Sequence, residues 1–253
     1  MKTLRVFLLT ATFLLSCFQN SYANTSKHRV TFTKNDIVFE KNGKYDMIKM
    51  NNTIASDEIG YPQLPLRAIS ILIPQNAVIK GIRVLSASQE KLDGNYLIYP
   101  SQSPLLPGQT GSFTNPNSSI YGSNSPYPLK SAEISNDGWM SGYRIVDVIL
   151  YPLQYQPKEG QLIFNKEIEF VVDYEISDKG PFSAERRYEK SHVLIRKAIE
   201  QLVYNTNDIN LLAPKVKIEK FDGNQYEKYL PLDVPTSQGS GVDYLIITND
   251  NMK

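Results

Sequence analysis

Cysteine and histidine are the side chains from which this chain could build a nucleophilic catalytic site, and both are scarce. The 253 residues contain one cysteine, Cys17, and two histidines, His28 and His192. A thiolate nucleophile needs a base beside it, and neither histidine has a recognisable nucleophile partner. No Gly-x-Ser-x-Gly elbow of a serine hydrolase is present, and the carboxylates are too scattered to name an acid–base pair. We therefore predict no catalytic, metal or cofactor site, and structural roles for both histidines.

The first 23 residues have the features of a secretory signal peptide. Lys2 and Arg5 make the start positive, residues 6–15 form an uncharged and mostly apolar run, and Ser21-Tyr22-Ala23 places small residues around a larger one. The apolar run is shorter than the ~20 residues that a membrane-spanning helix needs. We therefore predict cleavage after Ala23 and a chain that is secreted or displayed at a bacterial cell surface.

Lipidation is an alternative at the same place. Leu14-Leu15-Ser16-Cys17 is similar to a bacterial lipobox, although Leu15 fits that pattern imperfectly. In that case Cys17 would carry the lipid and hold the chain at the membrane. If cleavage follows Ala23 instead, the exported chain has neither a cysteine nor a membrane contact.

Composition and charge exclude further classes of protein. Hydrophobic residues make up 41% of the chain and charged residues 21%, as in ordinary globular proteins. Lysine and arginine number 27 against 26 aspartates and glutamates, and both signs are spread along the chain. A nucleic-acid-binding protein would instead show a basic face, so we predict no nucleic-acid partner.

Strand patterns dominate residues 24–180. Apolar and polar residues alternate through 69–73, and β-branched runs follow at 143–151 and 162–176. The polar residues Gln156–Gly160 lie between the last two runs and are typical of a hairpin connection. Many short β segments at this spacing predict a mainly β fold, an antiparallel β-sandwich of jelly-roll-like type, over residues 24–180.

Residues 100–128 interrupt the strand patterns. The stretch contains six prolines, three glycines and many serines and asparagines. Because proline removes a ladder donor and fixes the backbone, we expect a long surface excursion instead of a strand pair. Two roles stay open for it, a variable decoration of the sandwich edge and a contact with a partner.

Residues 181–241 are expected to form a helix and then a linker. Apolar residues recur at spacings of three and four within 188–204, namely Ile195, Ala198, Ile199, Leu202 and Val203. This spacing predicts one amphipathic helix whose apolar stripe packs on the sandwich or on a following domain. From Asn205 to Gly241 the sequence is polar and irregular, which is typical of a linker.

The last residues, 242–253, have a different character. Val242–Thr248 is an apolar run of the kind found in strands buried on both faces of a parallel sheet. Such a strand needs crossover helices and partner strands. The run is therefore either a strand added to another sheet or the first strand of an α/β domain. We expect the second, with residues 242–253 as the incomplete start of that domain.

Five motifs occur in an order that one known family shares. They are Gly60-Tyr-Pro-Gln-Leu-Pro65, Ile71-Leu-Ile-Pro74, Tyr99-Pro-Ser-Gln-Ser-Pro104, Gly138-Trp-Met-Ser-Gly-Tyr-Arg144 and Tyr151-Pro-Leu-Gln-Tyr-Gln-Pro157. Residues 28–177, which contain them, resemble the N-terminal propeptide of gingipain-type cysteine peptidases. Val242–Asn249 is similar to the opening strand of that family's peptidase domain.

The resemblance implies a β-sandwich prodomain whose partner is the cysteine peptidase domain downstream in the same precursor. Such a prodomain assists folding of the peptidase, covers its active-site cleft, and is removed by proteolysis. The family's catalytic cysteine and histidine lie deeper in the peptidase domain. We therefore expect residues 1–253 alone to have no cysteine-peptidase activity. A second class stays open, a secreted adhesin or carbohydrate-binding module in which Trp139 stacks on sugar rings.

In this family the element that enters the cleft can carry a basic side chain that imitates the substrate. The best match is a loop expected at residues 136–142, with Trp139, Met140 and Ser141, followed by Arg144. In this role Trp139 would anchor the interface and Arg144 would be the basic insert. The alternative is a Trp139 that fills the core and an Arg144 that pairs on the surface.

Removal of a prodomain requires a bond that a protease can reach. The expected linker contains four lysines and no arginine: Lys215, Lys217, Lys220 and Lys228. An arginine-specific enzyme would have to cut at Arg186-Arg187 or within the predicted helix. Because proteases cut exposed irregular backbone, we expect processing at one of these lysines or at another bond of the linker.

Overall fold

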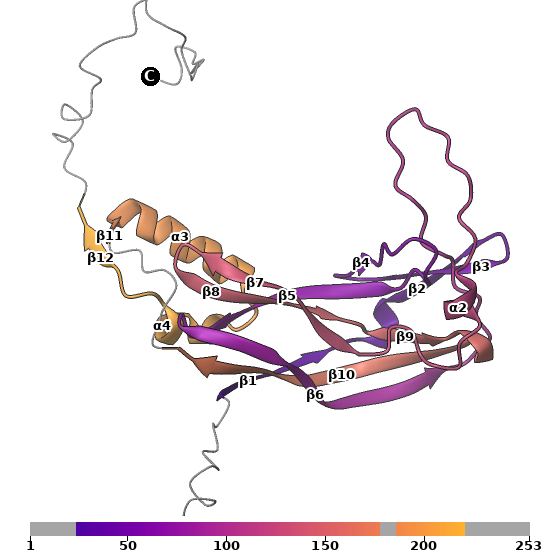
Figure 1. The fold of residues 1–253 in the computed structure, drawn as a ribbon, viewed down its shortest axis with the longest axis horizontal. Coiled ribbons are helices and arrows are strands. Elements are labelled where there is room, and N and C mark those ends of the chain that lie inside the picture. Colours follow the sequence, from indigo (N-terminus) through magenta and orange to yellow (C-terminus); the bar gives the residue numbers. More distant parts are fainter. Residues whose placement is uncertain (1–23, 178–185, 221–253) are drawn as a thin grey trace, which may run out of the picture.

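Two antiparallel sheets form the body of the protein. The computed structural model describes residues 24–177 and 186–220 (Figure 1). The lower sheet in Figure 1 is built around β10, with β6 along one edge and β1 and β9 along the other. Its strands are β1 (Asn24–Thr31), β6 (Ala77–Leu92), β9 (Leu153–Gln156) and β10 (Gln161–Ile176).

The upper sheet has the strand order β4-β5-β8-β7. Its strands are β4 (Ile54–Ala55), β5 (Pro65–Ile73), β7 (Ala132–Met140) and β8 (Tyr143–Leu150). A separate hairpin of β2 (Ile37–Asn42) and β3 (Tyr45–Met50) lies at one end of the sandwich, and a 3₁₀ turn, η1 (Lys34–Asp36), precedes it.

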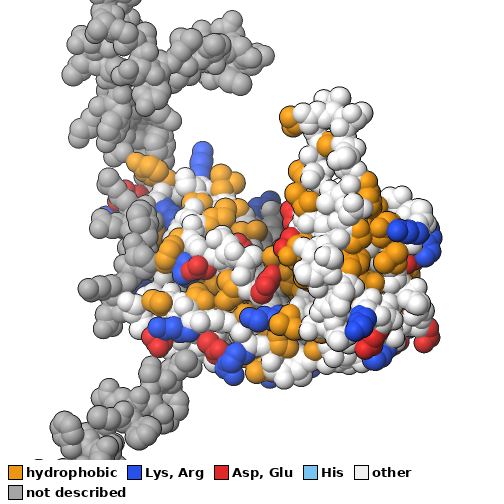
Figure 2. All heavy atoms as spheres, turned by 45° about the vertical axis from the view of Figure 1, so that its right-hand side comes forward, with side chains coloured by type: hydrophobic (Ala, Val, Ile, Leu, Met, Phe, Trp, Pro, Cys, Tyr) orange, Lys and Arg blue, Asp and Glu red, His pale blue; other side chains and the backbone are white. Residues whose placement is uncertain are grey.

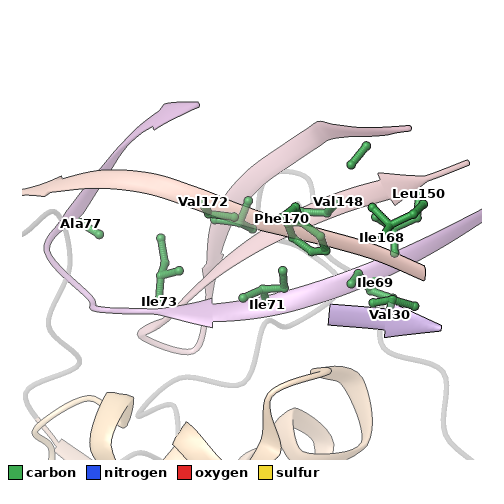
Figure 3. Packing of buried hydrophobic residues seen from close by; sticks show 12 residues of the cluster. Val30, Ile69, Ile71, Ile73, Ala77, Val148, Leu150, Ile168, Phe170 and Val172 are labelled. Atoms are coloured by element: carbon green, nitrogen blue, oxygen red, sulfur yellow. The ribbon is translucent and has the colours of Figure 1, made fainter. Parts of the chain in front are cut away.

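The core lies between the two sheets. Ile71 and Ile73 of the upper sheet are fully buried, as are Ile168 and Phe170 of the lower sheet, and their side chains point into the space between the sheets (Figure 3). This burial uses every second residue of each strand, which is the period of a pleated strand with one face toward the core. Each such side chain contributes about 1.5–3 kcal/mol. The predicted antiparallel, mainly β sandwich is confirmed.

The hairpin expected at residues 156–160 exists, but the strand before it is β9. A 3₁₀ turn, η2 (Pro157–Glu159), joins β9 to β10. Gly160 closes the turn at φ +61, and a Cβ there would lie 1.8 Å from Asn95 Oδ1. Strand β8, expected to be the hairpin partner, belongs to the upper sheet. The chain therefore crosses from one sheet to the other between β8 and β9.

The surface excursion predicted for residues 100–128 is present, and in the structure it covers residues 101–131. The stretch contains one short helix, α2 (Ser118–Tyr121), and an isolated bridge between Tyr127 and Tyr155. One loop of it projects from the body, with hydrophobic side chains at its tip and along its sides (Figure 2). Gln102 closes the base of the loop, because its Oε1 accepts from Thr114 N at 2.8 Å and its Nε2 donates to Thr114 O at 3.2 Å.

The predicted amphipathic helix is α3 (Glu189–Leu202), and it packs on the outer face of the upper sheet. Ile199 and Val203 are buried against Leu72 and Tyr143. Leu202, expected in the same stripe, is 46% exposed. The helices within the described residues are all too short or too polar to cross a membrane.

The first part of the expected linker has regular structure. After α3 come η3 (Thr206–Asp208), α4 (Ile209–Leu212) and β12 (Lys217–Glu219), and β12 pairs in parallel with β11 (Arg186–Tyr188). Asn205 Oδ1 accepts from Leu72 N at 2.8 Å and its Nδ2 donates to Leu72 O at 3.0 Å. The amide of Asn205 thus extends the edge of β5 as a strand would. Residues 221–253, including the expected strand at 242–248, lie outside the described residues.

Candidate functional site

The loop expected at residues 136–142 is the tip of a hairpin between β7 and β8. Trp139 pairs with Arg144 and Met140 with Tyr143. Only Ser141 and Gly142 form the turn, at φ 49 and φ 79. Two successive residues with positive φ suit the twist of a two-residue hairpin. The prediction of a loop was therefore wrong for Trp139 and Met140, which belong to strand β7.

Arg144 is buried, which contradicts its expected role as a basic insert, and Trp139 is partly exposed, which contradicts the alternative in which it fills the core. Arg144 is 4% exposed and Trp139 is 42% exposed. The guanidinium carbon of Arg144 lies 3.7 Å from the Trp139 ring centroid, and Arg144 Nη2 is ion-paired with Asp137 Oδ2. Trp139 Nε1 donates to Gln75 O at 3.4 Å. Arg144 is thus neither an exposed insert nor a surface ion pair, because strand alternation turns its side chain toward the core.

The contacts of Arg144 fix the hairpin. Its Nε and Nη1 have no hydrogen-bond partner among the described residues. A buried charge of this kind is stable only while its remaining partner is present. Asp137 and the ring of Trp139 supply the compensation, the second through a cation–π contact. Arg144 therefore holds Trp139 in one orientation.

A second arginine holds the turn from its other side. Arg187, on β11, is 8% exposed and donates from Nη2 to Ser141 O. A Cβ at Gly142 would lie 3.2 Å from Arg187 Nη2 and 3.2 Å from Pro214 Cβ, and φ there is +79, so the position favours glycine. From the sequence, Arg187 was considered only as part of a possible cleavage site at Arg186-Arg187. Gly142 in the motif around Trp139 was the signal that could have indicated close packing here.

The hairpin tip presents apolar surface on a rigid base. Met140 is 41% exposed, and Ser141 is also exposed. Trp139 adds the part of its ring that Arg144 does not cover. Aromatic and methionine side chains fixed in this way are frequent anchors of protein interfaces.

The processing candidates fall into two groups. Lys215, Lys217 and Lys220 are exposed, and Lys217 lies in β12, where its Nζ is 3.3 Å from Glu219 Oε1. Lys228 lies outside the described residues, as do Ala23 and Cys17. Arg187 is buried and its strand is paired, so the bond between Arg186 and Arg187 is protected in the folded chain.

The contacts of His28 are structural. His28 is 8% exposed, bonded to Ser26 Oγ at 2.7 Å, and its ring centroid is 5.6 Å from that of Phe170. Burial lowers the pKa of His28, and Asp208 partly opposes the shift. Among residues 24–177 and 186–220, no group of three His, Cys, Asp or Glu side chains could hold a metal ion.

Residues 12–202 match the sequence model of the family Propeptide_C25. The chain belongs to the Propeptide_C25 family. The resemblance to gingipain-type propeptides is thereby confirmed. The match also favours a propeptide over an adhesin or carbohydrate-binding module, and one face of the Trp139 ring is already occupied by Arg144.

Solved structures agree with this assignment of the Propeptide_C25 chain. One is described as a complex of Porphyromonas gingivalis RgpB pro- and mature domains. It has a TM-score of 0.58 and 16% identity, over 74% of this chain and 96% of that one. Another concerns zymogenic latency of gingipain K from Porphyromonas gingivalis, with a TM-score of 0.50 and 19% identity over 62% of this chain and 90% of that one. At such identities the likeness establishes the fold. No curated protein shows significant similarity to the chain.

Proposed function

We propose that this chain is the prodomain of a secreted gingipain-type cysteine peptidase. In this proposal it assists folding of the peptidase domain, covers the active-site cleft, and is removed by proteolysis. The observation that carries the proposal is the family match over residues 12–202. Two further observations support it: the fold is similar to that of a prodomain solved with its mature domain, and to a structure that concerns zymogenic latency.

The hairpin tip is the element that we assign to the peptidase contact. Trp139, Met140 and Ser141 are exposed there, while Arg144 and Arg187 hold the tip from beneath. A preformed tip loses little conformational entropy when it binds, which favours tight inhibition. In this version of the proposal Arg144 is a positioning residue for Trp139, and it does not itself enter the cleft.

Inhibition of the peptidase domain tests the proposal. The full chain is added to the separately produced peptidase domain of the same precursor, and hydrolysis of a peptide substrate is followed. We expect inhibition that Trp139→Ala weakens strongly, since large interface aromatics commonly contribute 2 kcal/mol or more, or about 30-fold in affinity. Arg144→Met should give a smaller loss, because it disturbs only the orientation of Trp139.

The control keeps the fold and changes a surface far from the tip. Leu129→Ala removes a side chain that is 72% exposed on the excursion, and it should inhibit as the unchanged chain does. A full chain that leaves peptide hydrolysis untouched would overturn the proposed function. Inhibition that survives Trp139→Ala unchanged would move the contact away from the tip.

Assistance in folding is tested separately. The denatured peptidase domain is diluted from urea with and without the full chain, and the recovered activity is measured after the prodomain has been removed. We expect a higher yield when the chain is present during dilution. An equal yield whether the chain is present or absent would remove the folding role and leave inhibition intact.

Export and removal are two further parts of the proposal. N-terminal sequencing of the exported chain should begin at Asn24 if cleavage follows Ala23, whereas a lipidated chain would begin at Cys17. N-terminal sequencing of the mature peptidase should place the processing site at or beyond Lys215. A new N-terminus at Arg187 would contradict the protection that β11 and its buried arginine provide.

A further inference from the structure

The outer face of the upper sheet is only partly covered. Helix α3 packs over Leu72, Tyr143 and Ile145 at one end of it. Farther along the same face, Ser70 of β5 and Asp147 of β8 point away from the core, since their sequence neighbours Ile69, Ile71, Val146 and Val148 point into it. The sheet between α3 and the excursion therefore presents side chains to solvent.

Two hollows that share three lining residues lie on this face. Both are lined by Ser70, Asp147 and Leu202. The first, of about 280 Å³, is also bordered by Gly138 and Met140 of the edge strand β7. The second, of about 460 Å³, is also bordered by Arg67 of β5 and by Tyr204. We call the two together the outer-face groove.

Asp147 is the acidic group of the outer-face groove, and its orientation is fixed. Its Oδ1 accepts from Ser70 Oγ at 2.6 Å, and its Oδ2 accepts from Asn136 Nδ2 at 3.3 Å. Both donors are neutral. No lysine or arginine among the described residues forms an ion pair with Asp147, and Arg67 at the far end of the groove does not reach it. The carboxylate is thus held in place with its charge uncompensated.

The walls of the groove have the complementary character. Leu202 is 46% exposed and Met140 is 41% exposed, and both line the part that contains Asp147. Gly138 leaves space, because a Cβ built there meets no atom within 4 Å. Exposed apolar side chains beside an oriented carboxylate suit a long cationic side chain, whose methylene stem packs on apolar surface while its head meets the charge.

We infer that the outer-face groove binds a lysine or arginine side chain on the surface of the peptidase domain. This inference rests on the proposed function and adds a second contact to it. Met140 belongs both to the hairpin tip and to the groove, so one partner surface could touch the two together. Charge complementarity at Asp147 would fix the register of that partner along β7.

Two variants of the full chain test the inference by independent means. Asp147→Asn removes the charge and keeps the shape, while Gly138→Leu fills the groove and keeps the charge. Gly138 is not in the left-handed region of φ, so a side chain is allowed there. Binding to the separately produced peptidase domain is measured by calorimetry. Each variant should weaken it by about tenfold or more, as truncation of a partly buried charge pair does.

Matched controls separate this effect from general charge or packing effects. Glu175→Gln makes the same change in net charge on the outer face of the lower sheet, where Glu175 pairs with Lys80, and it should bind as the unchanged chain does. Gly138→Ala should fall between the unchanged chain and Gly138→Leu. The effect of Asp147→Asn should shrink at ~1 M NaCl, since salt screens an ion pair at a partly exposed site. Unfolding midpoints show that each variant is folded.

The outcomes distinguish the inference from the proposed function. If the unchanged chain fails to bind the peptidase domain, the proposed function itself fails. If it binds, but Asp147→Asn and Gly138→Leu bind as tightly as Glu175→Gln, the peptidase contact stands and the groove is not part of it. Weakening by Gly138→Leu alone would also overturn the inference, because the cationic side chain is what the carboxylate is proposed to meet.

Discussion

The two outer faces of the sandwich differ in how their charges are compensated. On the lower sheet, each of the four outward carboxylates of β10 has a cation partner: Arg29 with Glu167, Lys27 with Glu169, Arg83 with Asp173 and Lys80 with Glu175. On the upper sheet, Asp147 bonds only to neutral donors, and Glu133 accepts from Tyr151 Oη. The carboxylates of β10 on the lower face are thus neutralised within the protein, whereas the charge of Asp147 on the upper face is available to a partner.

The difference indicates which side of the prodomain is made to be covered. Exposed ion pairs contribute little stability each, but a charged ladder along the open strands β1 and β6 discourages pairing with another sheet edge. The outer side of the upper sheet instead carries α3, Met140 of the hairpin tip and the outer-face groove. We therefore expect the paired charges of the lower sheet to disfavour association there, and the unpaired carboxylate of the upper sheet to favour a cationic partner.

The largest expected effect comes from the core that both faces share. Phe170 is fully buried between the sheets. Phe170→Ala should lower the unfolding free energy by about 3–5 kcal/mol. Buried apolar surface is lost, and the cavity left behind adds a further cost. Urea denaturation of the full chain measures it. Binding to a peptidase domain should weaken only through the larger unfolded fraction, so this change affects both faces alike.

An exposed apolar side chain gives the contrast to Phe170. Leu129→Ala should change the unfolding free energy by less than about 0.5 kcal/mol, as surface substitutions usually do. If the two substitutions cost the same, the core described between the sheets would not be the main source of stability.

The next effect separates the hairpin tip from both faces. Asp137→Ala leaves Arg144 buried without an ionic partner, and we expect a loss of about 1–3 kcal/mol. Arg144→Met combined with Asp137→Ala should recover part of that loss, since the uncompensated charge is gone. Denaturation of the two single variants and the double variant forms a thermodynamic cycle. Strict additivity would mean that Asp137 and Arg144 do not stabilise each other.

Strand alternation predicted more of this molecule than the functional interpretation used. The alternation through 69–73 placed β5 correctly, and the spacing of Ile195 and Ile199 placed α3. Arg144 has the same parity as Val146 and Val148, so the sequence already indicated that its side chain points inward. The role of a basic insert, assigned to Arg144 from the motif around Trp139, was given more weight than this strand parity.

Other features depend on contacts that no local pattern contains. The pairing of β9 instead of β8 with β10 follows from a crossing between sheets, which the turn residues at 156–160 do not reveal. The loop expected at residues 136–142 contains the turn, but its length was overestimated, because serine is uncommon at the positive φ that lets Ser141 and Gly142 close the hairpin alone. That Asp147 has no cationic partner can be known only from the positions of the lysines and arginines on the neighbouring strands. Only the structure gives these positions.

A smaller effect concerns acid stability and comes from His28 beneath the lower face. Burial lowers the pKa of His28, so the folded state holds it neutral while the unfolded state takes up a proton near pH 6.5. Its contribution to stability is therefore complete above about pH 6.5 and is lost as the pH falls below that value. Unfolding free energies between about pH 7 and pH 5 should decline less steeply for His28→Gln than for the unchanged chain. Equal slopes would contradict the assignment.

The smallest expected effect tests whether the ion pairs of the lower sheet matter to folding. Glu90, on β6, accepts from Lys166 and Lys34, and these hydrogen bonds lower its pKa to about 2. A carboxyl group whose pKa falls on folding stabilises the protein above its unfolded pKa, and the contribution is lost as the pH drops from about 4.5 toward 2. Glu90→Gln should therefore lower the unfolding midpoint slightly at neutral pH and not at all at the acid end. Because the site is exposed, ~1 M NaCl should remove most of the difference.

A Glu133→Gln variant of the upper sheet is the control, because it breaks no ion pair. Its unfolding midpoint should show no such dependence on salt. A matching dependence would mean that the two faces are not electrostatically distinct.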